Sequence, residues 1–110
     1  MMSVKEYHKL VRDLIPQIIA KSGKKAVTRT LSMPEYRAEL NQKLLEETRE
    51  YLASEDVEEL ADIMEVIRAL LDLRGISFAS LEEIRLQKQK KNGAFGQRIY
   101  LEQVISDGYD

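Results

Sequence analysis

The chain of 110 residues has 44% hydrophobic and 33% charged residues, a composition typical of one folded domain and unlike that of a disordered chain. Its 17 basic and 19 acidic side chains give a net charge of -2, which argues against binding of duplex nucleic acid, since that needs a basic surface. The absence of cysteine and the single histidine exclude disulfides, thiolate metal sites, cysteine nucleophiles and multi-histidine zinc sites.

A short helix and a short extended segment are the first predicted elements. Asp13 can cap a helix that carries several leucine and isoleucine side chains, and Pro16 is tolerated in the first turn of this helix. Ser22-Gly23 is a typical helix end. Residues 25–31 alternate loosely between polar and β-branched side chains, which favours a short strand.

Two longer helices are predicted next. Ser32, with a glutamate three residues later, forms a capping-box pattern. The helix that begins there should run to about residue 53. Ser54 can cap the following helix, which covers about residues 55–74 and ends at Gly75.

A fourth helix and a second candidate strand complete the chain. Ser77 and Ser80 are equally good caps for the helix, and Asn92-Gly93 closes it. Residues 98–104 have a strand-like pattern and could pair with residues 25–31. We therefore predict an all-α protein, a four-helix bundle in one domain over residues 1–110, with at most this small β-hairpin.

Two acidic residues occupy unexpected positions on the second predicted helix. At ~100° per residue, one stripe of the helix is apolar, and it contains Tyr36, Leu40, Leu44 and Tyr51. Glu47 lies within this stripe, and Glu50 lies on its border. Both carboxylates therefore face the side of the helix that should pack on the core.

The third predicted helix shows the same anomaly. Its polar arc contains Glu58, Glu65, Arg68 and Asp72. Glu59 and Asp62 lie outside this arc, although the arc could have accommodated them. An ionised carboxylate on a buried face costs several kcal/mol unless it is paired or bound to a metal.

The four misplaced carboxylates predict a metal site. Glu47, Glu50, Glu59 and Asp62 would repel one another if the two helices pack antiparallel, and a divalent cation would relieve this repulsion. Oxygen ligands suit Mg²⁺ or Mn²⁺, which also keep coordination positions for water and substrate phosphates. The alternative is that each carboxylate pairs with a lysine or arginine. A di-iron site would need Glu-x-x-His pairs, and neither helix has a histidine.

Three segments of the sequence resemble a known family. Leu-Glu-Glu-Thr-Arg-Glu at 45–50 and Glu-Glu-Leu-Ala-Asp-Ile at 58–63 look like the signature of the MazG-type all-α nucleoside triphosphate pyrophosphohydrolases. Residues 7–16 and 92–98 resemble a short stand-alone branch of that superfamily, which includes proteins similar to phosphoribosyl-ATP pyrophosphohydrolase. One segment departs from the branch, because Asn-Gly-Ala-Phe at 92–95 stands where Arg-Gly-Gly-Phe is usual.

The resemblance implies a Mg²⁺-dependent hydrolase. Such an enzyme cleaves a nucleoside triphosphate between the α- and β-phosphates and releases a monophosphate and pyrophosphate, often as house-cleaning of non-canonical nucleotides. The metal ligands that it implies are Glu47, Glu50, Glu59 and Asp62, the same four that the helical wheels single out. Glu46, Glu47 and Glu50 are the candidates for the catalytic base, and Glu46 could instead orient the attacking water.

Basic side chains should face the carboxylates, because phosphoryl transfer needs neutralisation of the developing charge. The candidates for phosphate binding are Lys9, Arg12, Lys88, Lys91 and Arg98. For the run at 87–91 the alternative is a solvated helix end, whose cations complement the helix dipole.

The sequence also predicts partners and a compartment. The helix over about residues 55–74 is apolar over more than half its circumference, which favours a homodimer or a dimer of dimers. No apolar stretch approaches the ~20 residues of a membrane span, and residues 1–6 lack the apolar run of a signal peptide, so we expect a cytoplasmic protein. A non-catalytic helical interaction module and a nucleotide-sensing module are the alternatives to an enzyme.

Overall fold

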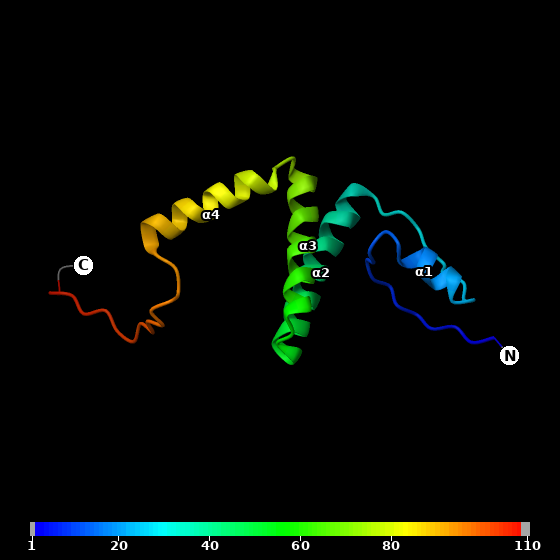
Figure 1. The fold of residues 1–110 in the computed structure, drawn as a ribbon, viewed down its shortest axis with the longest axis horizontal. Helices are drawn as coiled ribbons and strands as arrows, with labels where there is room; N and C mark the ends of the chain where they lie inside the picture. Colours follow the sequence, from blue (N-terminus) through cyan, green and yellow to red (C-terminus); the bar gives the residue numbers. More distant parts are fainter. Residues whose placement is uncertain (1, 109–110) are drawn as a thin grey trace. The chain divides into compact units, whose positions relative to one another are not determined.

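The computed structural model describes residues 2–108, and over these residues it contains four helices and no strand (Figure 1). The predicted all-α class is confirmed. The chain divides into two compact units, of which the first extends to Ile76 and the second begins at Ser77. Across the residues described, no helix is both long enough and apolar enough to cross a membrane.

Helix α1 (Ile15–Lys21) is short and carries no side-chain cap. Leu14 occupies the N-cap position, so the prediction that Asp13 caps this helix is wrong by one residue. Proline stands in the first turn as expected, since its missing N–H is not needed there. At the other end Gly23 adopts a φ of 84°, a left-handed conformation that glycine accepts without strain.

Helix α2 (Met33–Ser54) begins with the predicted capping box. The Ser32 hydroxyl accepts a hydrogen bond from the Glu35 backbone N–H at 3.3 Å, and the Glu35 carboxylate accepts one from the Ser32 N–H at 3.2 Å. Arg29 donates to the same carboxylate at 2.9 Å. These bonds, the one from Arg29 above all, lower the pKa of Glu35 to about 2. The start of α2 is therefore fixed by local contacts.

Helix α3 (Val57–Arg74) follows after a connection of two residues. Asp56 is its N-cap residue, whereas Ser54 is still part of α2 and accepts a hydrogen bond from the Asp56 N–H at 3.2 Å. The predicted cap at Ser54 is therefore wrong by two residues. Glu55 makes the turn with a φ of 57°. Helices α2 and α3 pack against each other as an antiparallel hairpin (Figure 1).

The buried core of the first unit lies between these two helices. Leu40, Val66 and Leu71 are its buried hydrophobic side chains, and Leu40 is only 3% exposed. One charged residue, Glu47, is buried with them at 7% exposure. The hairpin is thus the scaffold that positions the predicted carboxylates.

Helix α4 (Phe78–Asn92) belongs to the second unit. The Ser77 hydroxyl caps it by accepting a hydrogen bond from the Ser80 N–H at 3.1 Å, so the first of the two predicted starts is correct. None of the residues of α4 is buried.

The predicted β-hairpin between residues 25–31 and 98–104 is wrong, since neither segment forms a strand. A two-stranded hairpin is stable only when one of its faces is covered by apolar packing. Val27 is instead 90% exposed, and Arg29 is held by Glu35 at the start of α2. Local pairing with the helix therefore replaces strand pairing in this segment.

Candidate metal centre

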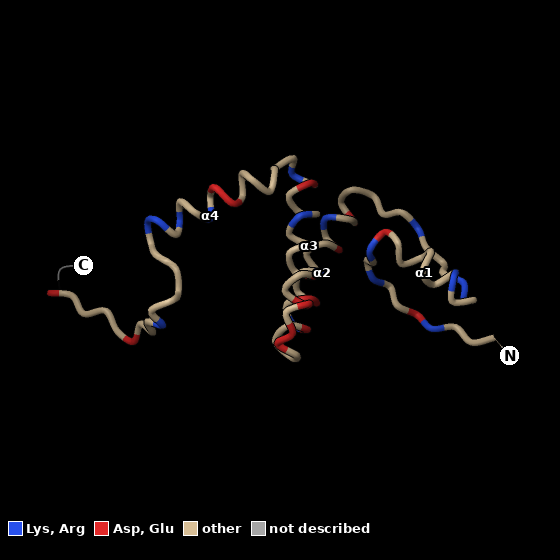
Figure 2. The backbone as a smooth tube through the Cα atoms, in the orientation of Figure 1, with Lys and Arg blue, Asp and Glu red and all other residues tan. Residues whose placement is uncertain are grey.

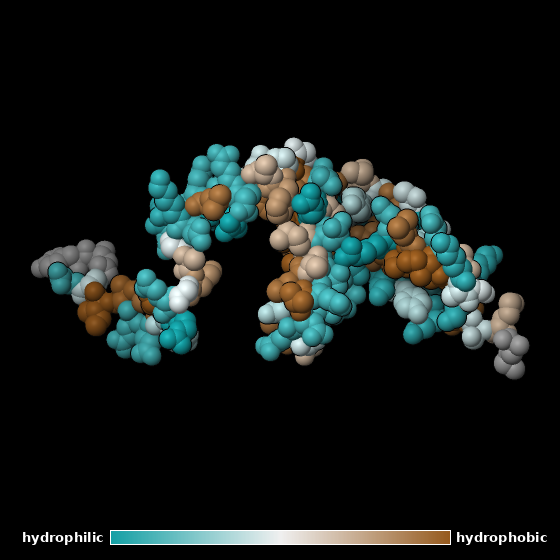
Figure 3. Space-filling view, viewed as in Figure 1, coloured by the Kyte–Doolittle hydropathy of each residue, from teal (hydrophilic) through white to brown (hydrophobic). Residues whose placement is uncertain are grey.

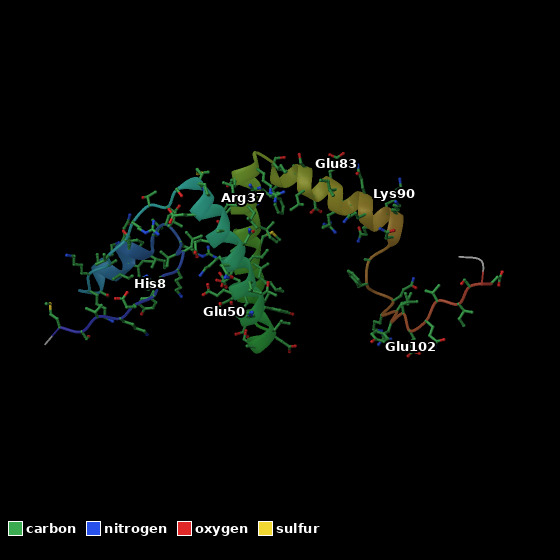
Figure 4. The ribbon with its side chains drawn as sticks, turned by 180° about the vertical axis from the view of Figure 1, so that it is seen from behind. His8, Arg37, Glu50, Glu83, Lys90 and Glu102 are labelled. Carbon is green, nitrogen blue, oxygen red and sulfur yellow. The ribbon has the colours of Figure 1, made fainter. Side chains whose placement is uncertain are left out.

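Three of the four predicted metal ligands meet on the α2–α3 hairpin. Glu47 and Glu50 lie one turn apart on α2, and Glu59 comes from the first turns of α3. Each of the three offers a carboxylate oxygen, and these oxygens lie within 4.8 Å of one another. Figure 2 shows acidic residues gathered toward the end of the hairpin where α2 passes into α3, and Figure 4 labels Glu50 among them. We call these three residues the carboxylate cluster.

Two oxygens of the carboxylate cluster are buried without a partner. Among the described residues, nothing donates a hydrogen bond to Oε2 of Glu47 or to Oε2 of Glu59. Glu47 is also the most enclosed member, because its side chain is 9% exposed. A buried polar atom without a partner is unfavourable by about 1–3 kcal/mol, and by more when it is charged. The cluster therefore contains acceptor capacity that the protein leaves unused.

The electrostatics of the cluster favour protonation. Burial raises the pKa of Glu47, and the hydrogen bond to Glu50 and the charge of Glu50 raise it further, against an opposing effect of Lys43. Burial also raises the pKa of Glu59, followed by the charges of Asp62 and Glu47. Carboxylates with raised pKa values in one cluster are typical of functional sites. A bound cation would favour the ionised form of both groups.

Asp62, the fourth predicted ligand, makes a different contact. Its Oδ1 accepts a hydrogen bond from Nη2 of Arg12 at 2.6 Å, across 50 residues of sequence. The two side chains are 38% and 56% exposed, respectively. Asp62 is still close enough for its charge to raise the pKa of Glu59. Arg12, predicted to bind phosphate, neutralises a carboxylate next to the cluster.

Lysine side chains surround the remaining predicted carboxylate, Glu46. Lys43 lies 3.2 Å from Oε2 of Glu46, and Lys9 lies 3.7 Å from its Oε1. Lys43 also contacts Oε1 of Glu47 at 3.4 Å. Lys43 is not among the residues predicted from the sequence, although its spacing of three and four residues from the two glutamates is the spacing of helical ion pairs.

The N-terminal segment and α2 line an open cavity next to the cluster. Its volume is about 480 Å³. It is lined by His8, Lys9, Leu10, Glu39, Gln42, Lys43, Leu45, Glu46, Arg49 and Glu50. Basic side chains and two of the predicted catalytic glutamates therefore share one concave surface, and small ligands bind in concave surfaces of this kind.

The other predicted phosphate-binding residues belong to the second unit. Lys88 and Lys91 are exposed near the end of α4. Arg98 follows in the tail with a φ of 58°, and its N–H donates to the Phe95 carbonyl at 3.0 Å. A role for these three residues in binding phosphate stays a prediction.

The raised pKa values predict how stability depends on pH. Between the ordinary value of 4.5 and the raised pKa values, the folded protein binds more protons at Glu47 and Glu59 than the unfolded chain does. The contribution of these two groups to stability is therefore present below the ordinary pKa and is lost as the pH rises through this window. Glu47→Gln removes one of these two titrating carboxyl groups.

We compare the urea midpoints of Glu47→Gln and the wild type, both measured without metal. As the pH is raised from ~4.5 to ~7, we expect the midpoint of the variant to rise relative to that of the wild type. Carboxyl groups that do not interact with Glu47 contribute equally to both proteins, so their effects cancel in the comparison. A gap that closes with rising pH would contradict the raised pKa of Glu47.

Comparison with known proteins identifies one related segment. No family model matches the chain, and no solved structure matches it. A protein of Mycolicibacterium smegmatis, described as an uncharacterized protein, is 52% identical over 46 residues. The matched segment covers 42% of this chain and 47% of that protein, so the match spans about half the length of the relative.

Proposed function

We propose that the protein is a Mg²⁺-dependent nucleoside triphosphate pyrophosphohydrolase that converts a triphosphate into a monophosphate and pyrophosphate, and that non-canonical nucleotides are its substrates. The observation that carries this proposal is the carboxylate cluster, in which buried oxygens of Glu47 and Glu59 have no hydrogen-bond partner among the described residues. The resemblance of residues 45–50 and 58–63 to the family signature supports the same assignment.

The residues present fit a hard divalent cation. Glu47, Glu50 and Glu59 offer oxygen ligands from two helices that pack against each other, and Mg²⁺ or Mn²⁺ prefers such ligands. Asp62 is the proposed fourth ligand. When bound, the metal would offset the charge of these carboxylates and polarise the phosphate oxygens of the substrate.

The surrounding side chains can perform the rest of the reaction. Lys9 lines the cavity next to the cluster and can neutralise part of the charge of a triphosphate. Glu50 is the best placed of the three candidate bases, because it is exposed and lines the same cavity, whereas Glu47 is buried. In the proposed reaction the Glu50 oxygen that is not offered to the metal takes a proton from the water that attacks the α-phosphorus. The bond between the α-phosphorus and the oxygen that bridges to the β-phosphorus then breaks and releases pyrophosphate.

The test is a panel of canonical and modified nucleoside triphosphates, assayed for pyrophosphate with Mg²⁺, with Mn²⁺ and with a chelator. The proposal requires equal amounts of pyrophosphate and monophosphate, formed only when a divalent cation is present. Binding of Mg²⁺ at 100 times its Kd should also stabilise the protein by ~2.7 kcal/mol.

Two other outcomes would favour the alternatives. Stabilisation by nucleotide and Mg²⁺ without turnover of any triphosphate would indicate a nucleotide-sensing module. The absence of any stabilisation by Mg²⁺ at constant ionic strength would indicate a non-catalytic helical interaction module.

We also propose that the protein assembles as a homodimer or a dimer of dimers. The hairpin exposes large apolar side chains, among them Leu52, Val57, Leu60 and Met64 (Figure 3). Exposed apolar surface of this kind is typical of helical interfaces. Light scattering at micromolar concentration should give two or four times the subunit mass of 12.7 kDa. A mass equal to one subunit would contradict this assembly.

A further inference from the structure

Lys43 is the basic residue most closely built into the carboxylate cluster. Its Nζ lies 3.4 Å from Oε1 of Glu47 and 3.2 Å from Oε2 of Glu46. The Lys43 side chain is only 17% exposed. By contrast, Lys9 and Arg12 reach the same region from the N-terminal segment, and their side chains are 44% and 56% exposed. The ammonium group of Lys43 is therefore a fixed, partly buried charge at the edge of the cluster.

This charge has opposite effects on the metal-free and the metal-bound protein. Without metal, it is the cation that contacts Glu47, the member with an unpartnered buried oxygen, and it opposes the rise in the pKa of that group. A cation bound by Glu47 would lie within a few ångströms of Nζ, because Nζ already contacts the other oxygen of the same carboxylate. Like charges at such a separation repel strongly in a partly buried site.

Resting on the proposed function, we propose that Lys43 is a positioning residue, an internal counter-ion that holds Glu47 in place while the metal is absent and that competes with the metal for this carboxylate. Lys43 keeps its contact with Glu46 when Glu47 binds the metal. Lys43 can give up Glu47 to the metal because it contacts two adjacent glutamates. Its ammonium group therefore retains Glu46 as a partner in both the metal-free and the metal-bound protein.

A merely structural role for Lys43 predicts a different result. If the lysine only packed between the two glutamates, its removal would destabilise the protein and leave the affinity for metal unchanged. If it oriented Glu47 for the metal, its removal would weaken metal binding. The counter-ion role alone combines lower stability without metal with tighter binding of the metal.

The experiment compares Lys43→Met with the wild type by thermal unfolding of the full chain during titration with MgCl₂ at constant ionic strength and pH 8. We expect a lower melting temperature without metal and a Kd for Mg²⁺ that is about tenfold lower. Lys43→Arg, which keeps the charge, should bind Mg²⁺ within about threefold of the wild type. Lys43→Gln serves as the second neutral variant if Lys43→Met does not fold.

Arg37→Gln is the matched control, because it removes one positive charge from the same helix. Arg37 is exposed, and it lies toward the other end of α2 from Glu50 (Figure 4). The rise along the helix puts it about 15 Å from Glu47, which is beyond the screening length of ~8 Å. Its Kd for Mg²⁺ should equal that of the wild type.

Equal or weaker binding of Mg²⁺ by both neutral variants would overturn the counter-ion role, whereas the proposed function would stand. A wild type whose melting temperature does not respond to Mg²⁺ would overturn the proposed function and this inference together.

Discussion

Replacing Glu47 with glutamine is expected to abolish the Mg²⁺-dependent rise in melting temperature and to lower the release of pyrophosphate by more than ~100-fold. The loss of a group that only orients a ligand typically costs 10–100-fold in metal affinity or activity, and the proposed role of Glu47 is that of a ligand. Glutamine keeps one oxygen and the size of the side chain, so the variant tests the charge and not the packing.

The same substitution should leave the metal-free protein as stable as the wild type, or make it more stable. Glu47 is buried, and the charge of Glu50 raises its pKa. A neutral amide relieves that repulsion, and Lys43 retains its contact with Glu46. Melting curves with and without Mg²⁺, together with pyrophosphate assays on the same samples, measure both halves of the prediction.

Glu58→Gln is the control, since it removes the same charge from an exposed position next to Glu59. It should change stability by no more than ~1 kcal/mol and should leave the response to Mg²⁺ intact. Under the alternative in which Glu47 is only the ion-pair partner of Lys43, Glu47→Gln would destabilise the protein, and neither it nor the wild type would respond to Mg²⁺. That combination would rule out the metal site.

Shortening Leu40 to alanine should destabilise the first unit by ~2–5 kcal/mol. Leu40 is the most completely buried apolar side chain of the described core, at 3% exposure, and it lies on α2 in the hairpin. The core contains few other buried side chains that could close around the space left by the substitution. A loss of this size corresponds to a decrease in melting temperature of at least ~8 °C.

Leu14→Ala is the matched control for this substitution, because Leu14 is 62% exposed at the start of α1. Its free energy of unfolding, measured with urea, should change by less than about 1 kcal/mol. Equal losses from both variants would show that the α2–α3 interface is not what stabilises the first unit.

The helices could be predicted from the sequence because their signals are local. The capping box at Ser32 and the cap at Ser77 each involve residues three positions apart, and the structure confirms both. The caps predicted at Asp13 and Ser54 were displaced by one and two residues, to Leu14 and Asp56, and neither of these two side chains makes a capping hydrogen bond. The predicted β-hairpin does not form. Pairing of two strands depends on which apolar surface covers them, and the sequence does not show whether such a surface is present.

The candidate site could be predicted only in part, for the same reason. The positions of Glu47 and Glu50 follow from helical periodicity, and the short connection after α2 makes it possible to place Glu59 opposite them. The pairing of Asp62 with Arg12 depends on the path of the N-terminal segment across 50 residues, which no local pattern encodes.

The two-residue connection between α2 and α3 also restricts how the chain can evolve in length. Glu59 is the third residue of α3, so its position relative to Glu50 is set by the end of α2, the two-residue connection and the first turn of α3. One residue inserted in the first turn of α3 would rotate the following side chains by about 100° and would turn Glu59 away from Glu47. Substitutions between these two positions leave that register intact. The number of residues between Glu50 and Glu59 is therefore under tighter constraint than the identity of the residues that lie between them.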